Sequence, residues 1–142
     1  MLLQEPDRTQ ADLNFSLFGI PIRIHPMFWA IAALLGLNAC DRDLSLLLIW
    51  VVAVFFSILL HELGHAVVIR WFGNRPWITL YAFGGLTSHD PRRSLRPGGT
   101  NTWGQILISF AGPGVGFLLV AVLLGIFQSA AHLSVGRRPD RP

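Results

Sequence analysis

The stretch SILLHELGHAVVIRWFG, residues Ser57–Gly73, decides how this chain folds. It continues the uncharged run LSLLLIWVVAVFFSILL (Leu44–Leu60), so we expect one helix over residues 44–72 that crosses a membrane. Two histidines and a glutamate lie inside this apolar helix. An ionisable side chain within a membrane-spanning segment costs about 3 kcal/mol on insertion scales and indicates a functional site. Three such side chains together strengthen that prediction.

The spacing of these three residues is typical of a metal site. His61 and His65 are four residues apart, so on a helix their ring nitrogens can point to one position. Glu62 is the next residue after His61, from which it can reach a water without being a ligand. In this HExxH pattern the histidines bind zinc and the glutamate is the general base. We therefore predict one Zn²⁺ bound by His61 and His65, with Glu62 catalytic; the alternative is that the histidines only pair across helices.

Composition favours an integral membrane protein. The chain has 142 residues, is 52% hydrophobic and 13% charged, and has a mean hydropathy of +0.52. All 11 basic residues are arginines scattered among apolar runs, without the basic patch interleaved with aromatic residues that would indicate nucleic-acid binding. The single cysteine, Cys40, excludes an internal disulfide and is expected to fill a helix end.

The expected fold is an α-helical integral membrane protein with about three transmembrane helices and short β-strands at the membrane edge. Residues 1–142 form one membrane-embedded unit in this interpretation. Besides 44–72, the apolar runs predict helices over 27–40 and 104–133, the last kinked by Pro113. Branched and aromatic residues predict strands within 15–25 and 77–88. Residues 90–101 are expected to form a solvated loop, and 134–142 an atypical arginine-rich tail.

The distribution of arginines predicts the orientation. A cytoplasmic N-terminus places seven arginines inside and four outside, which is the arrangement that the positive-inside rule favours. The predicted inside set is Arg8, Arg23, Arg70, Arg75, Arg92, Arg93 and Arg96. This multi-pass topology places the predicted metal site in the cytoplasmic half of the bilayer.

Four motifs, in this order along the chain, resemble the site-2 protease family of intramembrane zinc metalloproteases, which includes the bacterial sporulation-factor proteases. They are GIPIRIHP (19–26), HELGHA (61–66), FGG (83–85) and AGPGVGFLL (111–119). The resemblance implies an intramembrane zinc endopeptidase core in a bacterial or archaeal cell membrane. Its substrate would be a membrane-anchored protein, often a regulatory protein released into the cytoplasm.

The resemblance also implies a third zinc ligand that this sequence lacks. In the family this ligand is an aspartate in an Asp-Gly motif on a helix after the AGP helix. Asp90 and Asp140 lack that context and are not expected to bind the metal. Since family-like sequence stops after Leu133, we expect a truncated or frameshifted reading frame, or a homo-oligomer or partner chain that completes the site.

Two other functions compete with proteolysis as interpretations of this sequence. A catalytically inactive fragment or pseudoprotease would bind transmembrane partners without cutting them. A di-iron oxygenase is set aside, because five histidines with only one clustered pair are too few ligands for two irons.

The remaining motifs carry weaker predictions. A protease must hold its substrate extended, so Ile78–Phe83 is expected to be an edge strand that pairs with it. Gly84 and Gly85 either allow close backbone approach or form an ordinary turn. Gly112 and Gly116 are expected to pack tightly on the helix with the zinc ligands. We expect a structural or interfacial position for His25, and solvated or interfacial positions for His89 and His132.

Overall fold

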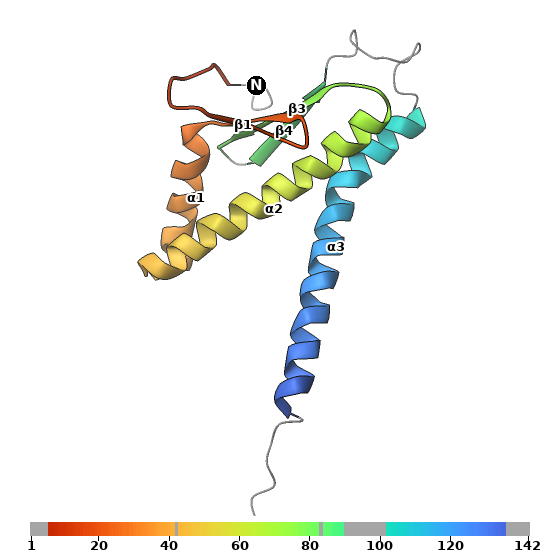
Figure 1. Ribbon diagram of the computed structural model, residues 1–142. Helices are drawn as coiled ribbons and strands as arrows, with labels where there is room; N and C mark the ends of the chain where they lie inside the picture. The colour runs from red at the N-terminus through yellow and green to blue at the C-terminus, as the bar shows by residue number, and fades with distance from the viewer. Residues whose placement is uncertain (1–5, 42, 83, 90–101, 136–142) are drawn as a thin grey trace, which may run out of the picture.

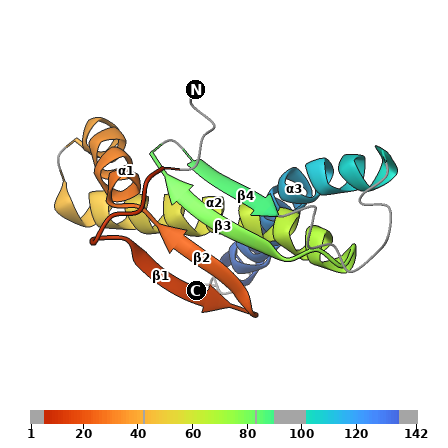
Figure 2. The same cartoon turned by 90° about the horizontal axis from the view of Figure 1, so that it is seen from above.

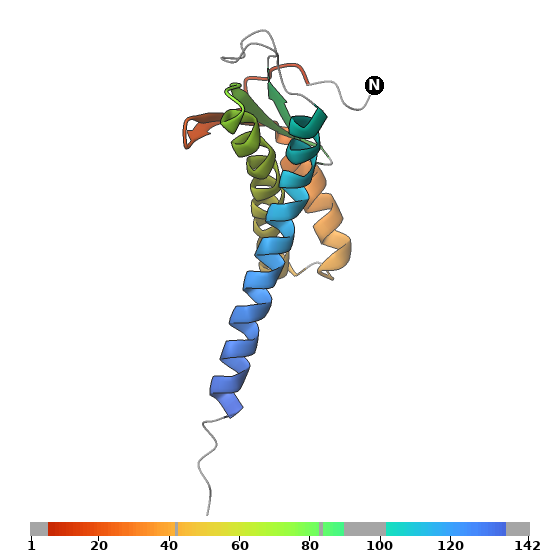
Figure 3. The ribbon, with the colours of Figure 1, turned by 90° about the vertical axis from the view of Figure 1, so that its right-hand side faces the viewer.

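The computed structural model describes residues 6–41, 43–82, 84–89 and 102–135, with the backbone alone from residue 131 onward. The elements are β1 (Leu13–Leu17), β2 (Ile20–Ile24), α1 (Pro26–Ala39), α2 (Leu44–Trp71), β3 (Pro76–Tyr81), β4 (Gly84–His89) and α3 (Thr102–Val135). The three helices extend from one side of a small sheet (Figures 1 and 3). The predicted loop 90–101 and nearly all of the predicted tail 134–142 lie outside the described residues.

The four strands form one mixed sheet in the order β1-β2-β3-β4. β1 and β2 form an antiparallel hairpin that turns at Phe18 and Gly19, both with positive φ. β2 pairs in parallel with β3 across the two intervening helices, and β3 pairs antiparallel with β4. The prediction that Ile78–Phe83 is an edge strand was wrong: β3 has a neighbour on each side, and the edges are β1 and β4. Each strand pair had been read by itself, and the parallel pairing depends on distant residues.

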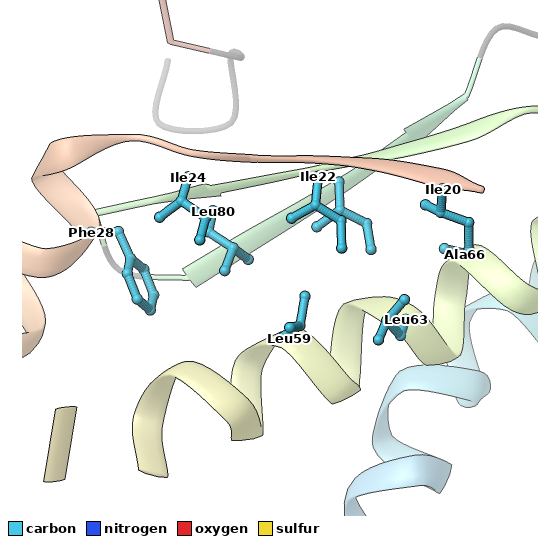
Figure 4. Packing of buried hydrophobic residues seen from close by; sticks show 9 residues of the cluster. Ile20, Ile22, Ile24, Phe28, Leu59, Leu63, Ala66 and Leu80 are labelled. Atoms are coloured by element: carbon cyan, nitrogen blue, oxygen red, sulfur yellow. The ribbon is translucent and has the colours of Figure 1, made fainter. Parts of the chain in front are cut away.

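The hydrophobic core lies between the sheet and the second half of α2, which runs beneath it (Figure 2). Alternate residues of β2 point toward the helix, as the two-residue period of a strand requires. Figure 4 shows these isoleucines above the helix: the buried set is Ile20, Ile22, Ile24, Phe28, Leu59, Leu63, Ala66, Ile78 and Leu80. Burying each large member contributes about 1.5–3 kcal/mol. The turn of α2 that carries HELGH is therefore held firmly under the sheet.

Local signals define where the first two helices begin and end. His25 caps α1, since its Nδ1 accepts a hydrogen bond from the Met27 amide. Asp43 caps α2 by accepting from two backbone amides, and Gly73, with φ 83°, follows its end. Cys40 is buried at the end of α1. The structural position expected for His25 and the helix-end position expected for Cys40 are both confirmed.

Two of the helices, α2 and α3, are long and apolar enough to cross a membrane among the residues that the structure describes. Their large apolar side chains are mostly exposed. α1 has 14 residues, fewer than the roughly 20 that a span requires. α3 continues through Pro113, and its first turns lie at an angle to the rest (Figure 1), as expected of a proline that removes one helical hydrogen bond.

Candidate metal centre

The two predicted ligands converge on one point. His61 and His65 are half-buried on the same face of α2, and their Nε2 atoms are 3.2 Å apart. Two nitrogens bound to one tetrahedral zinc at about 2.0–2.1 Å would be separated by about 3.3–3.4 Å. The pair therefore fits a shared zinc ion without rearrangement. The same spacing also fits a hydrogen bond between the two rings, which is the metal-free alternative.

A contact with α3 determines the orientation of the second histidine. His65 Nδ1 lies 2.6 Å from the backbone carbonyl oxygen of Ile108. A carbonyl only accepts hydrogen bonds, so Nδ1 carries the proton and a neutral ring leaves the Nε2 lone pair free. Metal-binding histidines are usually held in this way, because the bond fixes both tautomer and ring direction. His65 is thus oriented for metal binding by the main chain of α3.

Glycines allow the two helices to meet at this point. A Cβ added at Gly112 would lie 2.7 Å from His61 Nε2 and 2.6 Å from His65 Cε1, so only glycine leaves room for both rings. A Cβ at Gly64 would lie 2.6 Å from the carbonyl oxygen of Ala111. The tight packing predicted for Gly112 is confirmed. The same prediction was wrong for Gly116: a Cβ built there would face open space, because the helices separate beyond their crossing.

Glu62 is held from the opposite side by β4. Its side chain is 7% exposed, and the hydroxyl of Thr87 donates a 2.6 Å hydrogen bond to its Oε2. A Cβ added at Gly85 would lie 2.6 Å from Oε1, whereas a Cβ added at Gly84 would have nothing within 4 Å. Of the two predicted glycines, only Gly85 makes the close approach. Thr87 was not singled out from the sequence, although it lies two positions after Gly85 and so faces the same side of a strand.

The described residues supply two metal ligands and not a third. No group of three or more His, Cys, Asp or Glu side chains that can hold a metal occurs among them. His25 packs its ring against Tyr81, and His89 ends β4. Asp90, Asp140 and the side chain of His132 lie outside the described residues, so their predicted roles remain predictions.

Comparison with known proteins adds an independent line of support. The chain is 30% identical over 118 residues to zinc metalloprotease MJ0392 of Methanocaldococcus jannaschii, covering 80% of this chain and 32% of that protein. A relative from Synechocystis sp. is 34% identical over 117 residues, covering 73% of this chain and 29% of the relative. The solved structure of the site-2 protease from M. jannaschii superposes with a TM-score of 0.60 at 29% identity, covering 82% of this chain and 51% of that one. The chain belongs to the site-2 protease family.

The family assignment agrees with the HELGH geometry, since the relative's name specifies a zinc metalloprotease. No protein-family model matches the chain. The chain spans about a third of the length of these relatives. These similarities therefore identify the family, and they do not by themselves show that this chain cleaves proteins.

Proposed function

We propose that this chain is the zinc-binding part of an intramembrane metalloendopeptidase that cleaves membrane-anchored proteins by metal-activated water. The convergence of His61 and His65 Nε2 at 3.2 Å, with Glu62 beside them, carries the proposal. The names of the similar proteins support zinc as the metal and proteolysis as the reaction. Of the other two histidines among the described side chains, His25 caps α1 and His89 ends β4.

Membrane placement is part of the same proposal. α2 and α3 expose apolar side chains along most of their length, including Leu48, Ile49, Phe117 and Leu123, each more than half exposed. In water such surfaces would be unfavourable, whereas a bilayer would cover them. The sheet and the HELGH end of α2 lie at one end of the helices (Figures 1 and 3). The arginine distribution is what predicts that this end, with the N-terminus, faces the cytoplasm.

Each residue of the site has a role in this mechanism. His61 and His65 would hold the zinc, which supplies activated water and polarises the scissile carbonyl. Glu62 would take the proton from that water and pass it to the leaving amine. The hydrogen bond from Thr87 keeps the Glu62 carboxyl in place, and the Ile108 carbonyl keeps His65 in its binding tautomer.

The substrate would lie along β4. A helical peptide bond is shielded by its own hydrogen bonds, so the substrate must be extended before it can be cut. β4 is an edge strand, and its residues Gly85 and Thr87 already contact Glu62. An extended segment paired with the free edge would therefore pass close to the catalytic glutamate. This replaces the earlier expectation that placed the pairing edge at Ile78–Phe83.

A second candidate function follows from the donor set. With two histidines alone among the described ligands, a metal would be loosely held. If the site is catalytic, the third ligand would come from outside the described residues, for example from a second copy or a partner chain. If nothing supplies it, the chain binds transmembrane partners without cutting them.

One set of variants separates these functions. The chain is reconstituted in liposomes with a tagged single-pass membrane protein, and both zinc content and cleavage are measured. We expect His61→Ala and His65→Ala to lose zinc, and Glu62→Gln to keep zinc while cleavage falls about 100-fold or more. His89→Ala, outside the pair, serves as the matched control and should match the original chain in both measurements.

The outcomes are distinct. Cleavage that persists in Glu62→Gln would contradict the protease mechanism. Unchanged zinc content in His61→Ala would contradict the metal site. Zinc binding without cleavage, together with equal capture of the tagged protein by the original chain and Glu62→Gln, would favour the non-catalytic binder.

A further inference from the structure

The hydroxyl of Thr87 makes two contacts with a single residue of α2. Thr87 Oγ1 lies 2.6 Å from Glu62 Oε2 and 3.1 Å from the backbone carbonyl oxygen of Glu62. The hydroxyl has one proton to donate, and a carboxylate is the stronger acceptor. The short bond therefore goes to the side chain, which leaves the hydroxyl no proton to donate to the Glu62 carbonyl oxygen.

The two oxygens of the carboxyl differ in their surroundings. Thr87 donates a hydrogen bond to Oε2, while Gly85 packs closely against Cγ, Cδ and Oε1 of the same side chain. Gly85 and Thr87 are two residues apart on one strand, so both face α2. β4 thus binds one carboxyl oxygen and packs against the rest of the side chain, which fixes the direction of a side chain with three rotatable bonds.

We propose that Thr87 is a positioning residue for Glu62: its hydroxyl binds Oε2 and orients Oε1 toward the water that Glu62 deprotonates. This inference rests on the proposed function for its catalytic consequence, while the positioning itself depends only on the contact between β4 and α2. Register supports it, since Thr87 is paired with Ile78 and Gly85 with Leu80, and both partners lie in the buried core.

The first test is kinetic. Thr87→Val removes the hydroxyl and nearly keeps the shape, so kcat should fall about 10- to 100-fold while KM changes less than about twofold. Thr87→Ser retains the hydroxyl and should recover most of the lost rate. Ser88→Ala serves as the matched control, because it removes a hydroxyl from the adjacent residue, which faces the other side of the strand.

The second test needs no metal and no substrate. The melting temperature of the metal-free chain is measured for Thr87→Val in the original chain and in the Glu62→Ala background. We expect the loss of melting temperature caused by Thr87→Val to shrink by at least half when the carboxyl is absent. Gly85→Ala provides a second variant, which crowds Oε1 without touching Thr87 and should also lower kcat.

The outcomes keep the two proposals apart. Equal effects of Thr87→Val in both backgrounds would overturn the positioning role, whether or not the chain cleaves proteins. A kcat in Thr87→Val equal to that of Ser88→Ala would overturn it as well. Coupling in the melting experiment without cleavage by the original chain would support Thr87 as the partner of Glu62 and would refute only proteolysis by this chain without a further ligand.

Discussion

Replacement of Gly112 by alanine should weaken zinc binding while leaving the helix that carries it intact. The new Cβ would lie closest to His65 Nε2, and 2.7 Å from His61 Nε2. Ordinary contact begins at about 3.4 Å, so the His61 ring must move by at least about 0.7 Å and the His65 ring by more. The Ile108 carbonyl restrains the ring of His65, so relieving this contact requires that the hydrogen bond be disturbed or that α3 shift away. A metal site tolerates deviations of only about 0.2 Å from the usual metal–ligand distances, so this movement would disturb zinc binding.

The expected loss of zinc affinity follows from that displacement. Disturbing the groups that orient metal ligands typically lowers affinity 10- to 100-fold, and we expect a loss in this range. Alanine favours a helix over glycine by about 1 kcal/mol, so α3 itself should not be weakened. Gly114→Ala provides the control, because it gives the same preference on the same helix and nothing lies within 4 Å of its Cβ position.

The assay is a zinc competition with a chromophoric chelator, carried out on the chain in detergent micelles. The melting temperature of each metal-free variant is measured in parallel, to exclude global unfolding. If Gly112→Ala binds zinc within about twofold of Gly114→Ala, the rings do not depend on the space at residue 112, and our account of the site is refuted.

Two further predictions concern stability. Gly64→Ala would place a Cβ 2.6 Å from the Ala111 carbonyl oxygen, so we expect a loss of about 1–3 kcal/mol in thermal unfolding, whereas Gly125→Ala, with open space around it, should be neutral or stabilising. The Thr9 hydroxyl holds the pKa of Asp12 below its ordinary value of 3.8, so its stabilising effect is present above that pH and is lost as pH falls through the lowered pKa. Thr9→Val should therefore lower the melting temperature more at pH 6 than near pH 2; an equal difference at both pH values would contradict this account.

The geometry of the two histidine ligands was predictable because it is local. His61 and His65 are four positions apart on one helix, and helical periodicity alone brings their ring nitrogens together. The close packing of Gly112 on the helix that carries the two histidines was also predicted correctly, from a motif of small residues. Its companion Gly116 was not, since the angle at which α2 and α3 cross cannot be read from either helix alone.

The contacts of Glu62 could not be predicted in the same way. Thr87 is 25 residues from Glu62 along the chain, and their contact depends on the register of β4 and on the strand order. The hydrophobic pattern predicted strands on both sides of the two helices. It did not show that β2 and β3 pair in parallel, which makes β3 an interior strand and leaves β4 as the edge.

This strand pairing also has a consequence for the order of assembly. Ile22 and Ile78 are paired although they are 56 positions apart, and closing a flexible loop of that length costs about 3.5 kcal/mol in chain entropy. The packing of α1 against α2 shortens the effective loop before β2 and β3 meet. We therefore expect the helical hairpin to form first during synthesis and the sheet to close last. Glu62 would acquire its Thr87 partner only in that final step, so a nascent chain would hold both histidines before it had a positioned base.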